Sequence, residues 1–286
     1  MTIETLHNLM KHYKLNPNKT YGQHFLMDET ILEDMIDEAG VKAGDVVLEI
    51  GPGIGNLTER LLEHKAKVLS IEKDPQFLPV LKTLEKEKND SIKPKKKGEL
   101  PNFAYELTDA LKYNFSDRLK DVSYKVVANI PYYITGKIVQ LFMHAVHKPE
   151  SLTLLMQKEV AYNIAAKPGS MNLIAISVQL YADAKVVCVV PGHKFHPAPK
   201  VDSAVIHITL HKKPKYKVKD EAKLFRILHA CFSGKRKQLH NTLTNNLQLQ
   251  KEYVSETLTK LKIDPMIRPQ ALTIEQWIEL TDELKI

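Results

Sequence analysis

The sequence is poor in cysteine, and its two thiols lie far apart. Only Cys188 and Cys231 occur among the 286 residues, and they do not form a C-x-x-C pair. This pattern argues against a disulfide scaffold and against a cysteine-ligated zinc site, so we expect no metal. It is typical of a protein that works in a reducing interior.

The sequence also lacks long hydrophobic runs. No stretch approaches the roughly 20 apolar residues that span a bilayer, and residues 1–14 lack the apolar core of a secretory signal. We therefore expect a cytoplasmic protein with no membrane association. The hydrophobic content of 43% is far from that of disordered chains.

Acidic residues are in the minority, at 34 against 41 basic ones, which gives a net charge of +7. Such an excess permits a polyanionic partner without requiring one. A long basic segment, Lys212–Lys237, is opposed only by Asp220 and Glu221, and its lysines can contact phosphates. A second cluster, the insertion Lys93–Lys97, is better explained as part of a solvated, mobile loop at Glu87–Pro101.

A glycine-rich turn follows the first clear strand. Val46–Ile50 is a short run rich in β-branched residues, as in a strand covered on both faces. Gly51, Gly53 and Gly55 then allow a sharp turn into an amphipathic helix, and a ligand can approach the backbone closely there. The spacing is G-x-G-x-G, which weakens the case for a dinucleotide pyrophosphate.

Carboxylates follow the next two predicted strands. Lys67–Ile71 ends at Glu72, 23 positions after Glu49, where an acid suits two ribose hydroxyls. Phe103–Leu107 is followed by Asp109, which can accept from an adenine amino group. Each acid alone could be a solvated loop residue. Together they indicate an adenosine-containing cofactor without a pyrophosphate, and S-adenosylmethionine is the leading candidate.

The alternation of strands and helices predicts an α/β fold with a parallel sheet. Further strands are expected at residues 124–128 and 152–156, with an antiparallel pair at 185–190 and 204–210 closing the sheet. From residue 213 onward the apolar residues recur only at helical spacing. We predict an α/β domain at 1–212 and a small all-α domain at 213–286. Asp28 is a candidate N-cap for a helix at 29–39, whereas residues 1–20 show no strong pattern.

The tetrapeptide Asn129–Tyr132 lies at the end of the fourth predicted strand. In methyl transfer to an exocyclic amine, the nitrogen lone pair must point at the methyl group. Two hydrogen-bond acceptors, one for each N–H group, favour this geometry. Asn129 offers its side-chain carbonyl, and Ile130 offers a backbone carbonyl held extended by Pro131. Tyr132 offers a ring on which a base can stack. The alternative is a turn in which Asn129 caps a helix and Tyr132 packs in the core.

A second aromatic candidate is Phe195. Prolines 197 and 199 stiffen the segment after it, which would hold the ring over the other face of a flipped base. A core side chain under a loop is the alternative explanation.

These residues together resemble a known family. Its motifs occur here in order: Gly22-Gln-His-Phe-Leu26, Glu49-Ile-Gly-Pro-Gly53, Glu72-x-Asp74, Asp109-Ala110, Asn129-Ile-Pro-Tyr132-x-Ile134, Gln157-Lys-Glu-Val-Ala161 and Phe195-x-Pro-x-Pro-Lys-Val-Asp-Ser203. The family is that of the small-subunit ribosomal RNA adenine N6,N6-dimethyltransferases, the KsgA type. The similarity extends over roughly residues 20–250, including Phe232–Lys237.

The resemblance implies a Rossmann-like, S-adenosylmethionine-dependent methyltransferase fold for the domain at 1–212. It further implies dimethylation of two adjacent adenosines near the 3′ end of small-subunit ribosomal RNA, within a maturing subunit. It implies an RNA-binding role for the helical domain, and we expect a monomer. Residues carried over as cofactor contacts are Gln23, His24, Leu26, Glu49, Gly51, Gly53, Glu72, Asp109 and Asn129. Residues carried over to the adenine site are Asn129, Ile130, Pro131, Tyr132 and Phe195.

The chain departs from the family pattern at three places. Asn163 stands where an arginine is usual, Asn172-Leu173 stands where Tyr-Gly is usual, and the lysine-rich insertion before Pro101 is long. These departures concern RNA binding and not the chemistry. Two alternatives share the catalytic residues or the fold: a large-subunit RNA methyltransferase of the macrolide-resistance type, and a ribosome assembly factor with little activity.

Overall fold

The computed structural model describes residues 2–17, 22–89, 100–120, 122–234 and 237–286. The chain divides into two compact units, one formed by residues 1–161 and 183–210, the other by residues 162–182 and 211–286. The second unit therefore includes residues 162–182, which the sequence analysis placed in the first domain. The insertion Lys93–Lys97 lies outside the described residues.

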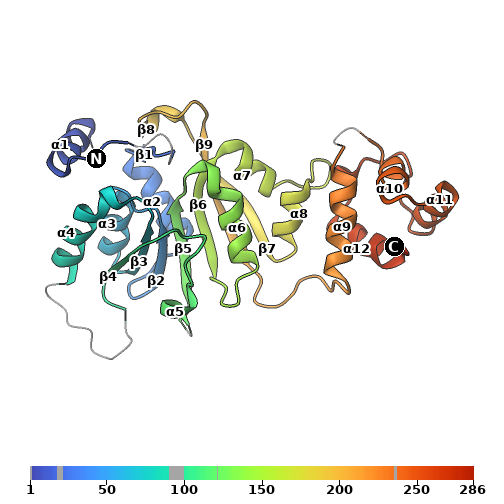
Figure 1. The fold of residues 1–286 in the computed structure, drawn as a ribbon, viewed down its shortest axis with the longest axis horizontal. Helices are drawn as coiled ribbons and strands as arrows, with labels where there is room; N and C mark the ends of the chain where they lie inside the picture. Colours follow the sequence, from blue (N-terminus) through green and yellow to red (C-terminus); the bar gives the residue numbers. More distant parts are fainter. Residues whose placement is uncertain (1, 18–21, 90–99, 121, 235–236) are drawn as a thin grey trace. The chain divides into compact units, whose positions relative to one another are not determined.

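The first unit is built on a sheet in which seven described strands have the order β4-β3-β2-β5-β6-β9-β7. Strands β2 to β6 are parallel to one another, and β9 runs antiparallel to β6. Figure 1 shows these strands side by side. Their bounds are β2 Val46–Ile50, β3 Lys67–Glu72, β4 Phe103–Leu107, β5 Tyr124–Asn129, β6 Ser151–Gln157, β7 Ala182–Val190 and β9 Ser203–Leu210.

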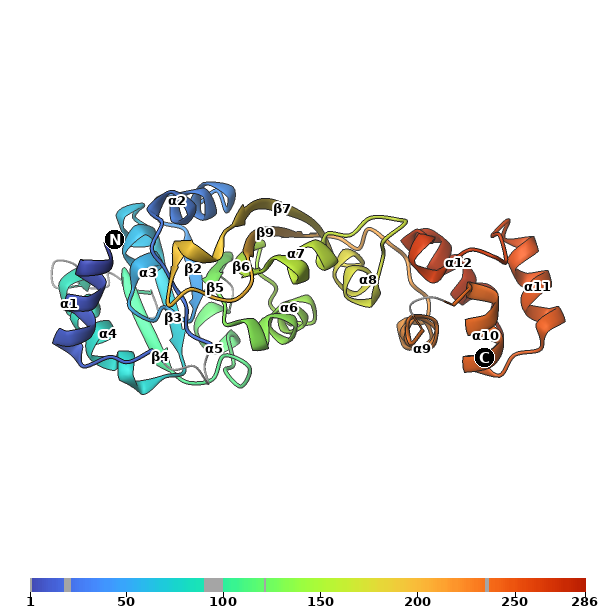
Figure 2. The same ribbon diagram turned by 90° about the horizontal axis from the view of Figure 1, so that it is seen from above.

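The predicted strands are all present, and the predicted pairing of the last two is confirmed. The backbone N–H of His211 donates to the carbonyl of Tyr181 at 2.8 Å, which links the end of β9 to the beginning of β7. This contact is the one that an antiparallel pair of strands requires. The parallel strands run as near-continuous apolar sequences because helices cover both faces of the sheet (Figure 2).

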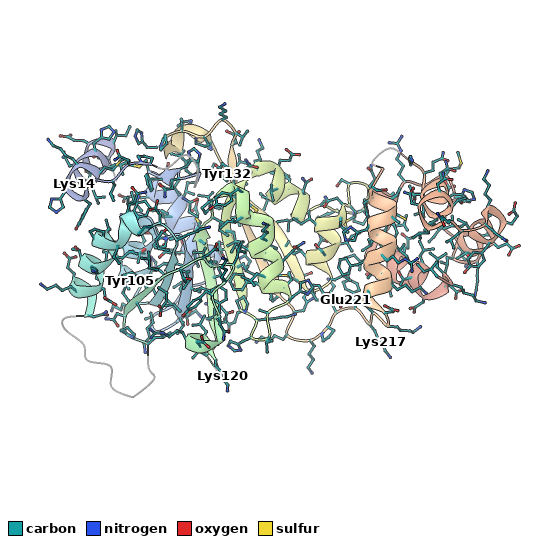
Figure 3. The ribbon with its side chains drawn as sticks, viewed as in Figure 1. Lys14, Tyr105, Lys120, Tyr132, Lys217 and Glu221 are labelled. Atoms are coloured by element: carbon teal, nitrogen blue, oxygen red, sulfur yellow. The ribbon has the colours of Figure 1, made fainter. Side chains whose placement is uncertain are left out.

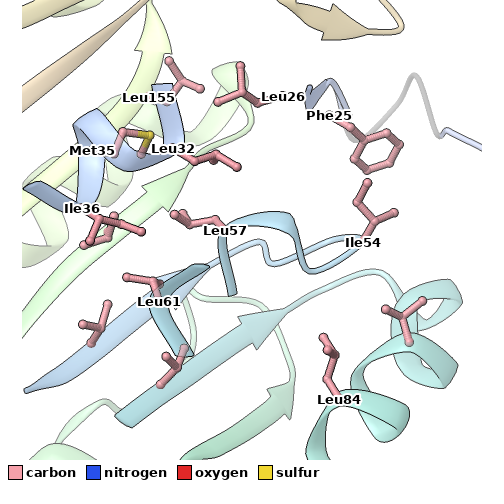
Figure 4. Close-up of a cluster of buried hydrophobic side chains, with 14 of the residues drawn as sticks. Phe25, Leu26, Leu32, Met35, Ile36, Ile54, Leu57, Leu61, Leu84 and Leu155 are labelled. Atoms are coloured by element: carbon pink, nitrogen blue, oxygen red, sulfur yellow. The ribbon is translucent and has the colours of Figure 1, made fainter. Parts of the chain in front are cut away.

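The helices of the first unit connect the strands. Leu32, Leu57 and Leu81, from three different helices, pack with Val47 and Val68 of the sheet in one buried cluster. Figure 4 shows part of this cluster. The helices are α2 Glu29–Glu38, α3 Asn56–Glu63, η2 Pro75–Phe77, α4 Leu78–Asn89, α5 Ser116–Leu119, η3 Tyr132–Ile134, α6 Thr135–Met143 and η4 Gly192–Lys194. Helix α7, Lys158–Ile164, contains the boundary between the two units.

Two local features at the amino-terminal side were difficult to predict. Helix α1, Ile3–Tyr13, is N-capped by Thr2 and buries Leu6 in the same cluster, although the sequence analysis found no strong pattern there. A two-stranded antiparallel sheet joins β1, Phe25–Leu26, to β8, Phe195–His196. The expected N-cap of α2 is confirmed, because the carboxylate of Asp28 accepts from the N–H of Thr30 at 3.0 Å.

The second unit is helical in its described residues. Its core packs Leu224, Leu243 and Trp277 together with Ile176 and Leu180, so residues 162–182 and 211–286 share one apolar interior. The helices are α8 Leu173–Gln179, α9 Glu221–Phe232, α10 Leu239–Leu247, α11 Lys251–Lys260, η5 Pro269–Ala271 and α12 Ile274–Glu283. Among the described residues, we find no helix with the length and apolar character needed to cross a membrane.

Candidate active site

A pocket lies at the carboxyl ends of β2, β3, β4 and β5. Parallel strands bring these ends to one edge of the sheet, so residues far apart in the sequence line a single cavity. Every predicted site residue except Phe195 lines it, namely Gln23, His24, Leu26, Glu49, Gly51, Gly53, Glu72, Asp109, Asn129, Ile130, Pro131 and Tyr132.

The glycine turn adopts a backbone conformation that other residues rarely reach. Gly51, Gly53 and Gly55 have φ angles of +73°, +54° and +87°. At Gly55 there is also no room, because an added Cβ would lie 2.7 Å from Cδ1 of Leu84. The turn therefore requires glycine for two separate physical reasons.

Glu72, at the end of β3, holds the glycine turn in place by hydrogen bonds. Its carboxylate accepts from the backbone N–H groups of Gly53 at 3.1 Å, Lys73 at 2.8 Å and Asp74 at 2.7 Å. Burial raises the pKa of this carboxyl, although the three N–H groups favour the charged form. A carboxylate has about four acceptor sites, so part of its capacity remains for a ligand hydroxyl.

Glu49 is more deeply buried, with 1% of its surface exposed. One of its oxygens accepts from the hydroxyls of Thr58 and Ser70, both at 2.7 Å. Burial, with a smaller contribution from the nearby charge of Glu72, raises the pKa of Glu49 to about 7, although the hydrogen bonds from Thr58 and Ser70 lower it. The hydroxyl pair therefore orients an acid that is partly protonated at neutral pH.

Asp109 follows β4 and is fixed on both of its oxygens. One accepts from the N–H of Leu111 and the other from the ammonium of Lys73, each at 3.0 Å. Burial raises the pKa of this carboxyl, but the bond to Lys73 and the other hydrogen bonds outweigh burial and leave it lowered. Asp109 is therefore an ionised acceptor at the pocket wall.

The segment Gly22–Leu26 connects the cofactor side of the pocket to the Asn129 side. The side-chain amide of Gln23 donates to Asp74 at 2.8 Å, next to Glu72. The carbonyl of His24 accepts from the side-chain amide of Asn129 at 3.2 Å. Leu26 adds an apolar wall, and its carbonyl accepts from Asn56 at 3.0 Å.

The bond to His24 sets the orientation of Asn129. Because the amide nitrogen donates to a carbonyl, the side-chain oxygen is left as the acceptor that the predicted chemistry needs. The helix-cap alternative is not observed, since neither η3 nor α6 has a side-chain cap. Ile130 is buried and its N–H donates to Leu155 at 3.2 Å, so the backbone that carries its carbonyl is anchored to β6.

Tyr132 is half-buried and lines the pocket; its place in the molecule is labelled in Figure 3. Its ring stacks on that of His24, with centroids 5.7 Å apart and planes at 25°. Its hydroxyl forms a 2.7 Å hydrogen bond with the hydroxyl of Ser203. Burial raises the pKa of Tyr132, with the bond to Ser203 opposing this rise.

Phe195 lies elsewhere. Only 4% of its surface is exposed, and it belongs to the apolar cluster of the first unit, paired with Leu26 across the small sheet. The structure thus places the side chain as the core alternative describes. Stacking of Phe195 on a flipped base remains a prediction that would require the ring to move.

Several pocket residues were not predicted from the sequence. Tyr133, Thr108 and Asp74 also line the cavity. Asp74 is buried and caps the turn of η2 through the N–H of Gln76 at 3.1 Å. An acid directly before Pro75 is a recognisable signal for such a cap. Ser203 was named only as the last residue of a family motif and not as a site residue, because its contact with Tyr132 depends on the order of the strands.

The donors and acceptors of this pocket fit S-adenosylmethionine. Glu72 and Asp109 offer carboxylate acceptors for a ribose and an adenine, and no phosphate-binding glycine spacing is present. An added Cβ at Gly51 would lie in van der Waals contact with the carbonyl oxygen of Asn129, 3.8 Å away, so the backbone at Gly51 is close to that of Asn129. The fold and the site define an S-adenosylmethionine-dependent methyltransferase of the class that acts on exocyclic amines.

Comparison with known proteins identifies the family. The family model "Ribosomal RNA adenine dimethylase" matches residues 14–285, and the chain belongs to this family. A protein of Dehalococcoides mccartyi named "Ribosomal RNA small subunit methyltransferase A" is 38% identical over 273 residues, which cover 95% of this chain and 90% of that protein. A protein of the same name from Lachnoclostridium phytofermentans is 39% identical, with coverage of 98% and 94%.

Solved structures show the same fold. A dimethyladenosine transferase from Plasmodium falciparum matches with a TM-score of 0.72 and 28% identity, covering 90% of this chain and 96% of that one. The 23S rRNA methyltransferase ErmE matches with a TM-score of 0.70 and 24% identity, covering 91% and 99%. The second similarity concerns the fold alone.

Proposed function

We propose that the protein transfers methyl groups to the N6 amines of two adjacent adenosines near the 3′ end of small-subunit ribosomal RNA. The substrate is the maturing small subunit, on which the protein acts as a monomer. Membership of the adenine dimethylase family and the names of the relatives support this proposal. The observation that carries it is the side-chain amide of Asn129, fixed by His24 with its oxygen left to accept.

The chain's contribution to the reaction is positioning. S-adenosylmethionine supplies an electrophilic methyl group when it is bound. The side-chain oxygen of Asn129 and the backbone carbonyl of Ile130 accept hydrogen bonds from the two N6–H groups of adenine. This arrangement turns the nitrogen lone pair out of conjugation and toward the methyl carbon. No side-chain base is needed, because the amine can lose its proton after transfer, and alignment supplies much of the rate increase.

The remaining residues hold the two reactants. Glu72 accepts from the ribose hydroxyls of the cofactor and Asp109 from its adenine, while Gln23, His24, Leu26, Glu49, Gly51 and Gly53 shape the cavity around it. The ring of Tyr132 is the stacking surface for the target base. The helical domain from residue 213 onward binds RNA, and the basic segment Lys212–Lys237 makes phosphate contacts there.

Methyl incorporation tests the substrate. Under-methylated small and large ribosomal subunits are incubated in parallel with the protein and labelled S-adenosylmethionine, and the nucleosides are then analysed. Dimethyladenosine confined to the small subunit is the expected result. Label in the large subunit alone would move the protein to the macrolide-resistance type, and absence of label in both would contradict the proposal.

An Asn129→Ala variant tests the chemistry and separates an enzyme from an assembly factor. We expect a loss of at least about 100-fold in methylation, because an acceptor aimed at the transition state is removed, while affinity for the small subunit is kept. Asn114→Ala is the matched control, since Asn114 lies away from the pocket and bonds to Asp117. Equal activity in Asn129→Ala and the control would contradict the assigned role.

A further inference from the structure

The ring of Tyr132 is held from two sides by residues of other segments. His24 lies against it in a stacked arrangement, and the hydroxyl of Ser203 bonds to its hydroxyl at 2.7 Å. Ser203 is fully buried and Tyr132 is half-buried. The hydrogen bond is therefore an internal contact between η3 and β9 and not one between two exposed side chains.

The topology of the sheet delivers Ser203 to this position. Ser203 is the first residue of β9 and pairs with Gln157, the last residue of β6, because the two strands are antiparallel. The carboxyl end of β6 lies beside that of β5, from which the chain continues into η3 and Tyr132. Ser203 is fully buried, so its hydroxyl occupies a fixed place in the sheet.

The other side of the ring is fixed through the same connecting segment. A ring nitrogen of His24 bonds to the carbonyl of Pro197 at 2.7 Å. The backbone carbonyl of His24 in turn accepts from Asn129 at 3.2 Å. Pro197 and Ser203 belong to a single stretch of chain. Through their hydrogen bonds they position both the ring of Tyr132 and the side chain of Asn129, which is one of the two N6 acceptors.

We propose that Ser203 is a positioning residue for methyl transfer. Its hydrogen bond holds the Tyr132 ring at the angle at which a stacked adenine presents N6 to Asn129 and Ile130. Without this bond the ring could rotate about its side-chain torsions, and a base stacked on it would adopt several orientations. Small errors of alignment slow methyl transfer, because the reaction depends on geometry. This inference rests on the proposed function, and its test includes a separate readout for that function.

A double-mutant cycle tests the inference on the full-length protein with under-methylated small subunits. Ser203→Ala and Tyr132→Phe each remove one end of the hydrogen bond and keep the serine backbone or the stacking ring. We expect either change to lower kcat by about tenfold, with the Kd for S-adenosylmethionine unchanged. The double variant should be no slower than the single ones, because both remove the same bond.

Ser151→Ala is the matched control. Ser151 is also buried, but it lies at the opposite end of β6 from Gln157. We expect it to keep the unaltered kcat, which shows that loss of a buried serine hydroxyl as such does not slow the reaction. Unaltered kcat in Ser203→Ala, or additive losses in the double variant, would overturn the inference. Inactivity of the unaltered protein on small subunits would instead overturn the proposed function.

Discussion

Two buried carboxylates, Glu49 and Glu72, lie at the ends of neighbouring strands. Glu72 is held by three backbone N–H groups, whereas Glu49 is held by the hydroxyls of Thr58 and Ser70. Burial raises the pKa of both, and the mutual repulsion adds to this for Glu49. The two acids therefore differ in what holds them, and in the proposed function it is Glu72 that accepts from the cofactor.

The first prediction concerns stability and pH at Glu49. Its pKa is about 7 in the folded protein against an ordinary 4.5, so the folded state binds its proton more tightly than the unfolded state does. The contribution of Glu49 to stability is therefore lost as pH rises from about 4.5 to about 7. The free energy of unfolding of Glu49→Gln is compared with that of the unaltered protein at pH 5 and at pH 8. The difference should shift in favour of the variant by about 2 to 3 kcal/mol from the lower to the higher pH.

Urea unfolding at the two pH values measures this difference. Ser151→Ala serves as the control, because it alters a buried side chain that does not titrate in this pH range. Its difference from the unaltered protein should not change with pH. A constant difference for Glu49→Gln as well would show that Glu49 has an ordinary pKa in the folded protein.

At the scale of single elements, the site depends on how α3 begins. The helix has no side-chain cap and starts at Gly55, whose positive φ reverses the chain after β2. Leu84 of α4 packs directly over this glycine. The turn is thus defined by its backbone conformation and by the packing of a neighbouring helix, and both would resist any side chain at position 55.

We therefore predict that Gly55→Ala destabilises the protein by about 1 to 3 kcal/mol, from strain at positive φ and displacement of Leu84. Gly136→Ala is a useful comparison, because Gly136 is helical and has nothing within 4 Å of an added Cβ. It should be neutral or stabilise by up to about 1 kcal/mol. Thermal or urea unfolding distinguishes the two, and equal stabilities would contradict the explanation of the turn.

At the scale of the whole molecule, the second unit is formed by two separate segments of the chain. Residues 162–182 leave the first unit between β6 and β7, and residues 211–286 follow β9. Met171, Ile176 and Leu180 belong to the apolar core that α9, α10 and α12 complete. A cut at residue 210 therefore divides one hydrophobic core, although it falls close to the boundary predicted from the sequence.

The third prediction follows from this division. Removal of residues 211–286 alone should leave the apolar side chains of 162–182 exposed, so the shortened protein should aggregate and bind a hydrophobic dye. Replacing residues 162–182 with a short Gly-Ser linker in the same shortened chain should restore solubility and keep S-adenosylmethionine binding by calorimetry. A soluble, dye-negative product from the first deletion would contradict the division.

The strands, the glycine turn and the acids at successive strand ends could all be predicted from the sequence alone. These signals are local, because apolar runs, glycine spacing and strand-end acids are each read within a few residues, and parallel strands necessarily bring their carboxyl ends together. The arrangement of Glu72, Asp109 and Asn129 around one pocket therefore required no knowledge of distant contacts.

The remaining features depend on long-range contacts and could not be predicted from the sequence. Burial of Phe195, the bond between Ser203 and Tyr132, and membership of residues 162–182 in the second unit all depend on which segments meet in space. Helix α1 likewise shows its buried face only once Leu6 has a surface to pack on. Such contacts join residues tens of positions apart, and no local pattern of side chains specifies them.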